Sequence, residues 1–598
     1  MKKLFFIFLF NISLFATEDS YFLDYIYVNA NTGQSSGGHS AIRLGKIVYH
    51  FQYFPDKIFH IIREPWEDFR YVYGIQENRT IYILKIELDK KVFNHFFERL
   101  NEIYLYQKKE LDNLEKLEND VKILESILKG DGRVYLKGTG YFSNHLKNDK
   151  SYYSLKTRIA SSLGRNYILK ELISIRRKIN QFQIPSNGEL EIDMSKLRYP
   201  ITVDNYSTDY LESLSYLKSL EILQDELDLK KDGYFEFAGN SINKNIFDKL
   251  SNSLKEKENE IIQLLQSKNE MNGYSLLISI ARYLVIRKSL EEGKLFFLNS
   301  FGKNHSLVVG DALENRTFLE GIDKQITTKI KNHFLEIENT DSLSERKYTE
   351  LEDLINRKKE ITDGINEKKA IRVNHEIMLP SKEDSIYLYK YESSSLDYER
   401  IYKLYLKNRD KYLLSLQNKY PFNLFTRNCT TEIFRTLNSI MGENPMKLGE
   451  IIQEKDSFVF VPVYAYYSVG KKYKVTREEK VPSLRTMILN EKSKKNYYNR
   501  LKEISTLSSE YYRFNQEDSI FIFFTDEEIF FRPLFGFINL ISGIGELGYG
   551  VVISPFDGGD RVVKGLQGIF FSGPELIFFN IRKGTFIYEG NSFSSESE

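Results

Sequence analysis

The sequence predicts an α+β protein with a large helical insertion and a β-rich C-terminal region. Short apolar and aromatic runs typical of strands fill the first hundred residues, and similar runs return beyond residue 510. Between them lie long stretches with apolar residues at helical spacing among mixed charges. We therefore expect a leader and four parts, with the bounds 1–16, 17–105, 106–385, 386–475 and 510–598.

Composition and charge narrow the class of protein. Of the 598 residues, 41% are hydrophobic and 14% aromatic, which is enough to build several buried cores and excludes a disordered chain. The 84 basic and 83 acidic residues leave a formal charge of +1. This balance gives no reason to expect a nucleic-acid partner.

The first 16 residues, "MKKLFFIFLFNISLFA", are typical of a secretory signal peptide. Two lysines precede an apolar run that is too short for a membrane span, and a small residue, Ala16, precedes a polar stretch. We expect cleavage after Ala16 and a mature protein in the periplasm or cell envelope. We identify no later stretch of 18 apolar residues, and therefore expect no transmembrane helix.

The elements follow from local patterns. Strands are expected in "YFLDYIYVNA", "HSAIRL", "KIVYHFQYF" and "RTIYILKIEL", followed by a helix near Lys90–Leu105. Residues 106–385 form amphipathic helices, and coiled-coil pairing is an alternative that no sustained heptad favours. Another helix runs from about Tyr387 to Tyr420. The runs "DSIFIFFTDEEIFFRPLFGFINL", "ELGYGVVISPF" and "PELIFFNIRKGTFIYEG" predict C-terminal strands, either a soluble sheet or one associated peripherally with the outer membrane.

Cys429 is the one cysteine of the chain. It precedes apolar positions at helical spacing, so a helix is expected to start beside it, with Asn428 as N-cap and Gly442 as C-cap. A thiol at a helix N-terminus lies where the helix dipole favours the thiolate. The N–H groups around Asn428 and Thr430 could stabilise an oxyanion there. The alternative is a small buried hydrophobe.

A catalytic thiol needs a base, and His39 is the strongest candidate among eight histidines. It follows a flexible "NTGQSSGG" stretch and opens the strand "HSAIRL", which a turn at Gly45–Lys46 joins to "IVYHFQY". In that hairpin paired positions sum to 91, so His39 faces Gln52, and His50 lies diagonally on the same face. A register slip of one residue would remove this arrangement. His305, in "GKNHSLVVGD", is the rival base, and purely structural histidines are the other alternative.

Three segments carry a resemblance to a known family. "SGGHSAIRL", "ENRTIYILKIELDKKVFNHFFERLNEI" and "FNLFTRNCTTEIFRTLN" resemble the Lnb-type N-terminal periplasmic domains, which have a Gly-His motif followed much later by Asn-Cys. That family is similar to circularly permuted NlpC/P60 enzymes and to lecithin-retinol-acyltransferase-like proteins. The resemblance implies a permuted papain-like core with Cys429 as nucleophile and His39 as base. The 389 residues that separate them depart from a minimal domain of this kind.

The sequence therefore predicts an exported cysteine acyltransferase or thiol hydrolase that acts through a thioester, with His50 or Gln52 orienting the base. For Lnb itself the resemblance implies N-acylation of lipoproteins, so a lipid or lipoprotein substrate is expected, without cofactor or metal. Hydrolysis of peptidoglycan peptides is the second enzyme hypothesis. A catalytically silent envelope scaffold is the third.

Overall fold

The computed structural model describes residues 21–577 and residue 583, apart from 30–37, 78, 131, 186–188, 191–195, 238–243, 301–306, 309–315, 341–342, 368–370, 373–378, 389–394, 442–451, 454–455, 457, 496, 511, 513, 515–517 and 526–528. The expected signal peptide, the rival His305 and the expected C-cap Gly442 lie outside the described residues.

A six-stranded antiparallel sheet forms the centre of the molecule, with the strand order β14-β5-β1-β2-β3-β4. Its strands are β1 (Tyr21–Val28), β2 (His39–Leu44), β3 (Ile47–Tyr53), β4 (Phe59–Pro65), β5 (Ile81–Leu88) and β14 (Val475–Val481). Leu44 pairs with Ile47 and Ala41 with His50, so the predicted hairpin register is confirmed. Gly45 has a φ of +61° at the turn, a conformation that glycine adopts without strain.

Each face of the sheet has its own apolar cover. On one face, Leu23, Ile42 and Tyr49 share a core with α11 (Cys429–Met441), α12 (Pro462–Lys472) and the first turns of α2 (Lys90–Leu128). On the other face, Ile26, Ala41 and Val48 pack against α1 (Trp66–Arg70) and the π-helical turn Tyr71–Gln76. Because successive side chains of a strand point to opposite faces, the sheet separates two cores. Cys429 packs against the first of them, on the face covered by α11.

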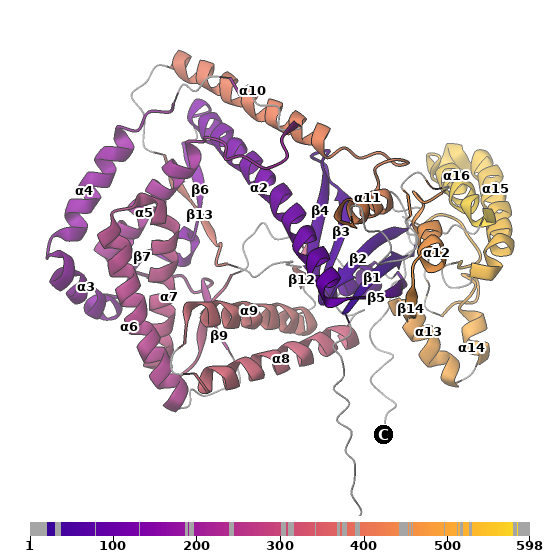
Figure 1. Ribbon diagram of the computed structural model, residues 1–598, viewed down its shortest axis with the longest axis horizontal. Coiled ribbons are helices and arrows are strands. Elements are labelled where there is room, and N and C mark those ends of the chain that lie inside the picture. Colours follow the sequence, from indigo (N-terminus) through magenta and orange to yellow (C-terminus); the bar gives the residue numbers. More distant parts are fainter. Residues whose placement is uncertain are drawn as a thin grey trace, which may run out of the picture.

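The helical region lies beside the sheet and forms a large arc on the left of Figure 1. Its helices are α3 (Asp149–Leu163), α4 (Tyr167–Asn180), α5 (Ser207–Asp225), α6 (Lys244–Ser267), α7 (Gly273–Glu292), α8 (Arg316–Glu338), α9 (Glu345–Glu367) and α10 (Ser395–Lys419). Short strand pairs brace them: β6 (Arg133–Lys137) with β13 (Glu383–Tyr387), β7 (Phe142–Lys147) with β8 (Leu227–Leu229), β9 (Tyr234–Glu236) with β10 (Phe296–Leu298), and β11 (Leu307–Val308) with β12 (Ile371–Arg372).

The expected boundary at residue 105 falls inside one continuous helix. α2 has 39 residues: Phe96 and Leu100 pack on the sheet, whereas Val121 and Leu124 belong to the core of the helical region. α10 packs alongside α2 and leads the chain back to the sheet (Figure 1). The helix expected to end near Leu105 therefore continues, because its apolar spacing serves two different cores in turn.

The prediction of a β-rich C-terminal region is wrong for the residues that the structure describes up to 577, whereas most of the last expected strand, in "PELIFFNIRKGTFIYEG", lies outside the described residues. After α13 (Leu484–Lys495) and α14 (Tyr497–Lys502), the chain forms two helices, α15 (Arg532–Asp557) and α16 (Asp560–Ser572). The glycines that look like strand breakers lie seven residues apart at 536, 543 and 550, and all three are buried on one side of α15. α15 is also long and apolar enough to cross a membrane, which corrects the expectation that no such segment follows the leader.

Candidate active site

Asn428 fixes the start of the cysteine helix. Its side-chain Oδ1 accepts hydrogen bonds from the amides of Thr430 and Thr431, each at 3.0 Å, as an N-cap residue does. Its Nδ2 donates to the carbonyl oxygens of Leu424 and Phe460 at 2.8 and 2.6 Å. With both ends of the amide engaged, Asn428 positions Cys429 and has no donor left for a substrate oxygen.

The Cys429 thiol lies near the start of β2, beyond the last residue pair between β2 and β3. Strand pairing between β2 and β3 extends to Ala41 and His50, which releases the amide of Ser40 on the β3 side. That amide acts on the Cys429 sulfur and favours a lower pKa of the thiol. The Ser40 hydroxyl lies 3.1 Å from Thr430 Oγ1, and Thr430 Oγ1 lies 3.8 Å from the sulfur. Residues 390 positions apart are thereby joined at the residue that follows His39.

A chain of three buried side chains crosses the neighbouring strands. His39 on β2 contacts His50 on β3, with 3.0 Å between His39 Nε2 and His50 Nδ1. His50 Nε2 lies 2.7 Å from Glu64 Oε1 on β4. The predicted register brings the two histidines together, because they occupy the same face on adjacent strands. Of the two predicted orienting groups, His50 is therefore the one that contacts His39.

The chain of contacts determines which nitrogen of His39 can accept a proton. An ionised Glu64 only accepts hydrogen bonds, so a neutral His50 donates from Nε2 and accepts at Nδ1. His39 then donates from Nε2, and its lone pair is on Nδ1. These tautomers follow from the bonding pattern, not from observed hydrogens. In this state Nδ1 of His39 is the nitrogen that can accept a proton, and Glu64 orients the His39 ring through His50.

Aromatic rings hold the two imidazoles in place on the face opposite α11. Tyr73 stacks on His39 with 5.3 Å between ring centroids and a 15° angle between planes. Phe69 and Tyr73 meet His50 edge-on at 5.4 and 6.1 Å. The thiol and the imidazoles thus approach the start of β2 from opposite faces of the sheet. The Cys429 thiol also acts electrostatically on the Tyr73 hydroxyl, which places both groups in the same neighbourhood.

Arg79 brings a buried positive charge to the same place. Its Nε donates to the carbonyl oxygen of Asn29, the residue after the strand partner of His39, and its guanidinium lies 5.4 Å from the Tyr73 ring centroid. Nη1 contacts Glu77 at 2.7 Å. Within the described part of the chain the third nitrogen, Nη2, is buried without a hydrogen-bond partner. Such a donor is costly to bury and suited to an anionic oxygen.

Burial is the main cause of the pKa shifts of Cys429 and His39. It raises the pKa of the Cys429 thiol above its ordinary value, although hydrogen bonds from Ser40 and Thr430 and the charge of Arg79 act in the opposite direction. Cys429 as a whole is half-buried, and its sulfur lies 3.8 Å from Thr430 Oγ1. Burial, His50 and Arg79 lower the pKa of His39 well below its usual range. The expected thiolate at the helix start is therefore wrong: the resting pair is a neutral thiol and a neutral imidazole.

The structure separates the remaining candidates from this group. Gln52 is exposed and pairs with His60, so its side chain is not an orienting group. Glu64, Arg79 and Tyr73 were missed by the sequence analysis. Glu64 could have been found by extending the hairpin logic, because Gln52 pairs with His60 and Val48 with Glu64, which puts Glu64 on the face of His50.

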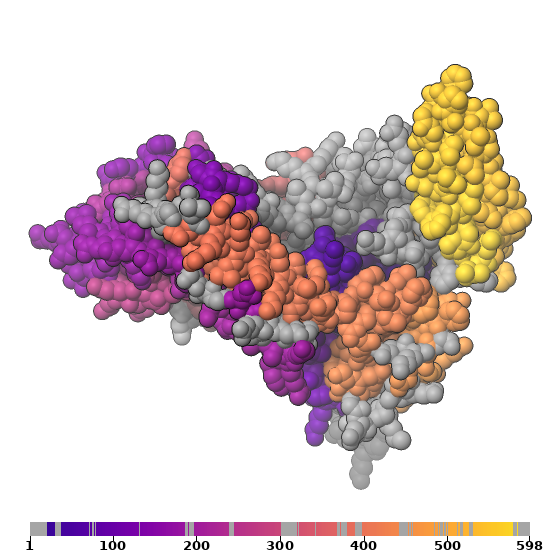
Figure 2. Space-filling model, turned by 90° about the horizontal axis from the view of Figure 1, so that it is seen from above, coloured from indigo at the N-terminus to yellow at the C-terminus, as the bar shows by residue number. Residues whose placement is uncertain are grey.

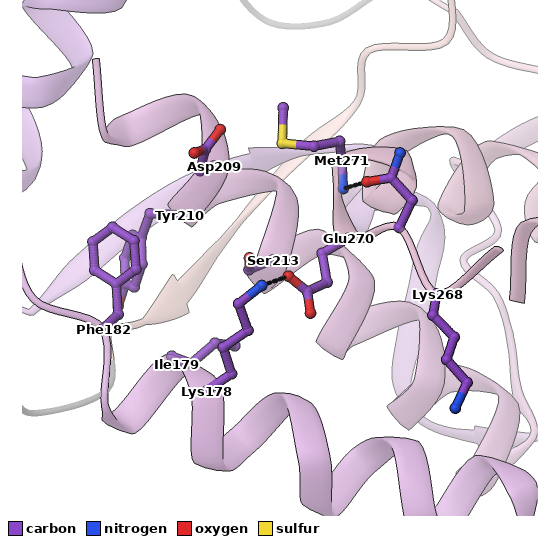
Figure 3. Close-up of a pocket in the computed structure, with 10 residues that line it drawn as sticks. Lys178, Ile179, Phe182, Asp209, Tyr210, Ser213, Lys268, Glu270 and Met271 are labelled. Carbon is purple, nitrogen blue, oxygen red and sulfur yellow. Dashed lines mark hydrogen bonds and ion pairs between the residues drawn. The ribbon is translucent and has the colours of Figure 1, made fainter. Parts of the chain in front are cut away.

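Other hollows lie in the helical region. One cavity of about 290 Å³, shown in Figure 3, is crossed by an ion pair between Lys178 and Glu270. A larger one of about 820 Å³ opens between α3 and α4. Neither is lined by residues of the Cys429 site. Among the described side chains, no group of three or more His, Cys, Asp and Glu is placed to hold a metal ion.

Comparisons with known proteins leave the site to be judged on its own geometry. No family model, no curated protein and no solved structure matches the chain.

Proposed function

We propose that the protein is a cysteine-dependent acyl-transfer enzyme with Cys429 as nucleophile and His39 as general base. The observation that carries the proposal is the 3.1 Å contact between Ser40 Oγ and Thr430 Oγ1, which joins the start of the cysteine helix to the residue that follows His39 of the His39–His50–Glu64 chain. A nucleophile, a base and an orienting group in sequence are the arrangement that acyl transfer needs.

The chemistry starts from neutral partners. As Sγ attacks the carbonyl carbon of an ester or amide, the thiol proton passes to Nδ1 of His39, and Glu64 stabilises the resulting cation through His50. The oxyanion is stabilised by the positive charge of Arg79 and by the Cys429 amide, which has no acceptor within the first turn. Collapse breaks the bond to the leaving group, which takes the proton from His39, and leaves a thioester. An amine or water then attacks the thioester, with His39 as base again.

The substrate proposal rests on the resemblance to the Lnb-type domains. A phospholipid ester is the acyl donor and the amine of a lipoprotein the acceptor, in an exported protein of the periplasm or cell envelope. The same steps would serve a peptidoglycan peptidase, whose acyl group is a peptide. The two differ in the mass that Cys429 acquires.

Intact-protein mass spectrometry after incubation with phospholipid vesicles tests the proposal. Wild-type protein should gain one fatty acyl group, removable by neutral hydroxylamine and mapped to Cys429, and Cys429→Ser and His39→Ala should gain none. His60→Ala is the matched control, because His60 contacts Asp56 outside the chain of three and should leave the adduct unchanged. Wild-type protein without an acyl group, or an adduct that survives Cys429→Ser, would refute a phospholipid acyl-enzyme.

A further inference from the structure

The C-terminal helices α15 and α16 form a hairpin that projects from the body of the molecule. Figure 2 shows it in yellow, rising above the neighbouring surface. Two glycines at the turn, Gly558 and Gly559, have φ values of +65° and +86°, which let the chain reverse within two residues. Since the tip extends beyond the body, most of each helix faces outward.

The two helices touch along their backbones. A Cβ added at Gly543 would lie 2.8 Å from the amide nitrogen of Ile569, and one at Gly550 would lie 2.7 Å from that of Val562. From the other helix, a Cβ at Gly565 would lie 2.5 Å from the amide nitrogen of Leu547. Small residues that bring backbones this close are characteristic of helix pairs in lipid, where packing replaces the hydrophobic effect.

With glycines on the inside, the large apolar side chains are left on the outside. They begin in the turn Ile529–Phe531 just before α15, recur along the length of α15 and continue on α16. Exposed members are Phe530, Phe531, Leu534, Phe537, Ile541, Ile544, Tyr549, Val551, Val552, Phe556, Val563, Leu566 and Phe570. Only 22% of the most apolar 18-residue window of α15 is buried. So continuous an apolar surface requires a partner.

The charges of the hairpin are compensated within it. Residues 532–572 contain three basic and three acidic side chains, a net charge of zero. Glu546 pairs with Arg561 at 2.9 Å, and Asp560 with Lys564 at 2.8 Å. Asp557 accepts from the amides of Gly559 and Arg561 at the turn. Paired charges can enter a low-dielectric medium at much lower cost than isolated ones.

We infer that the α15–α16 hairpin inserts into a lipid bilayer and holds the protein on a membrane surface. The 26 residues of α15 measure about 39 Å at the helical rise, which exceeds the roughly 30 Å hydrocarbon core. A protein partner would cover one side of the pair, whereas the exposed apolar residues belong to both helices. α16, with 13 residues, is too short to recross a bilayer, so the hairpin enters from the side on which the body lies.

The base of the hairpin lies near the catalytic strands. Arg532, at the start of α15, acts electrostatically on Tyr27 of β1, the strand that pairs with β2. A Cβ at Gly38, the residue before His39, would lie 2.6 Å from the Tyr27 ring. Insertion would therefore bring the opening of β2 toward the lipid headgroups. Membrane binding itself is independent of the chemistry proposed for Cys429.

Vesicle flotation tests this inference. The tip residues Val552 and Phe556, 73% and 89% exposed, make no core contacts that a substitution would break. V552D/F556D should keep the native circular dichroism spectrum and lower the partition coefficient onto phosphatidylethanolamine–phosphatidylglycerol vesicles at least about a hundredfold. The matched control Y135D/Y153D changes two side chains of the helical region that are 70% and 76% exposed, and should float like the wild type.

The outcomes distinguish a lipid bilayer from a second copy of the protein as the partner of the hairpin. They also distinguish failure of membrane insertion from failure of the catalytic proposal. Phe556→Trp should show fluorescence quenching by lipids brominated on their acyl chains. Wild-type protein that stays at the bottom of the gradient, or a V552D/F556D protein that floats normally, would overturn membrane insertion. A dimer that forms without lipid and is lost in V552D/F556D, together with no flotation, would identify a second copy as the occupant. Release of p-nitrophenol from a water-soluble ester should be equal in both variants, and its absence with normal flotation would count against the catalytic proposal alone.

Discussion

Two buried polar clusters, one in the helical region and one in the sheet, use charge in opposite ways. In the helical region Arg282 of α7 contacts both Glu345 and Glu352 of α9, and Lys257 of α6 contacts Glu345 at 2.5 Å. Opposite charges meet there and hold three helices together. In the sheet, His39 and Cys429 are surrounded so that both remain neutral.

The contrast separates structural from chemical roles. Side chains that are already paired with an opposite charge do not readily gain or lose a proton, and their contribution is to position helices. The His39–His50–Glu64 chain instead ends at His39, whose imidazole has no carboxylate of its own among the described residues to neutralise it, and Ser40, the next residue, contacts Thr430 at the start of the cysteine helix. Perturbed protonation without a neutralising partner is the pattern expected of reactive groups. Substitutions in the two clusters should therefore have different consequences.

The largest expected effect is loss of the base. His39→Ala should lower the rate of Cys429 acylation about 10²- to 10⁴-fold, because proton transfer from the thiol loses its acceptor. Stopped-flow release of p-nitrophenol from an activated ester measures this rate. His60→Ala is the control. Equal rates for His39→Ala and the wild type would show that His39 is not the base. The cluster in the sheet would then have a structural role, like the cluster in the helical region.

Loss of the buried Arg79 should have the next largest effect on the acylation rate. Arg79→Met should slow acylation about 10²- to 10³-fold if its free nitrogen binds the developing oxyanion. Arg79→Lys keeps the charge and should recover part of the rate. A rate unchanged in Arg79→Met, with a native spectrum, would assign Arg79 to the packing of Asn29 and Tyr73 alone.

In the helical cluster the expected loss is of stability, not of rate. Arg282→Met leaves the fully buried Glu352 without its partner and should lower the free energy of unfolding by about 3–5 kcal/mol. Urea denaturation measures this, and acylation of Cys429 should stay within about twofold, since the sheet has a separate core. The double variant Arg282→Met/Glu352→Leu should regain stability, because it removes both charges.

A smaller change is expected at the far end of the His39–His50–Glu64 chain. Glu64→Gln keeps the shape but removes the charge that supports a His39 cation, and should slow acylation about 10- to 100-fold. The pH–rate profile should change with it, since the amide can donate as well as accept and no longer sets the tautomer of His50. A profile identical to that of the wild type would show that Glu64 only fills space.

Some parts of the candidate site could be predicted from the sequence and others could not. The hairpin at Gly45–Lys46 and the N-cap Asn428 are local, so register and helix start could be predicted from neighbouring residues. Glu64 required a third strand whose pattern, "FHIIREP", does not alternate clearly. The thiol pKa depends on burial by segments hundreds of residues away. Glycines 536, 543 and 550 were misread because a helix contact and a strand break share the same residue.

The smallest expected effect concerns pH. Because the pKa of Cys429 is raised above its ordinary value of 9.0, the folded protein keeps the proton where the unfolded chain loses it. This contribution to stability is fully present below pH 9.0 and is lost as the pH rises through the folded pKa. Native iodoacetamide alkylation should likewise be half-maximal above pH 9.0, and the stability difference between wild type and Cys429→Ser should shrink there. Half-maximal alkylation well below pH 8 would restore the thiolate expected from the helix start.

The continuous helix α2 connects the sheet and the helical region mechanically. One end rests on the sheet through Phe96 and Leu100, and the other is clamped through Val121 and Leu124, about 58 Å of rigid rod for 39 residues. A tilt of a few degrees imposed at the outer end moves that end by several ångströms and rotates the part of α2 that contacts β4, where Gln107 hydrogen-bonds with the backbone of Phe59 and Ile61. A force applied to the helical region would thus rotate α2 against β4, the strand that carries Glu64.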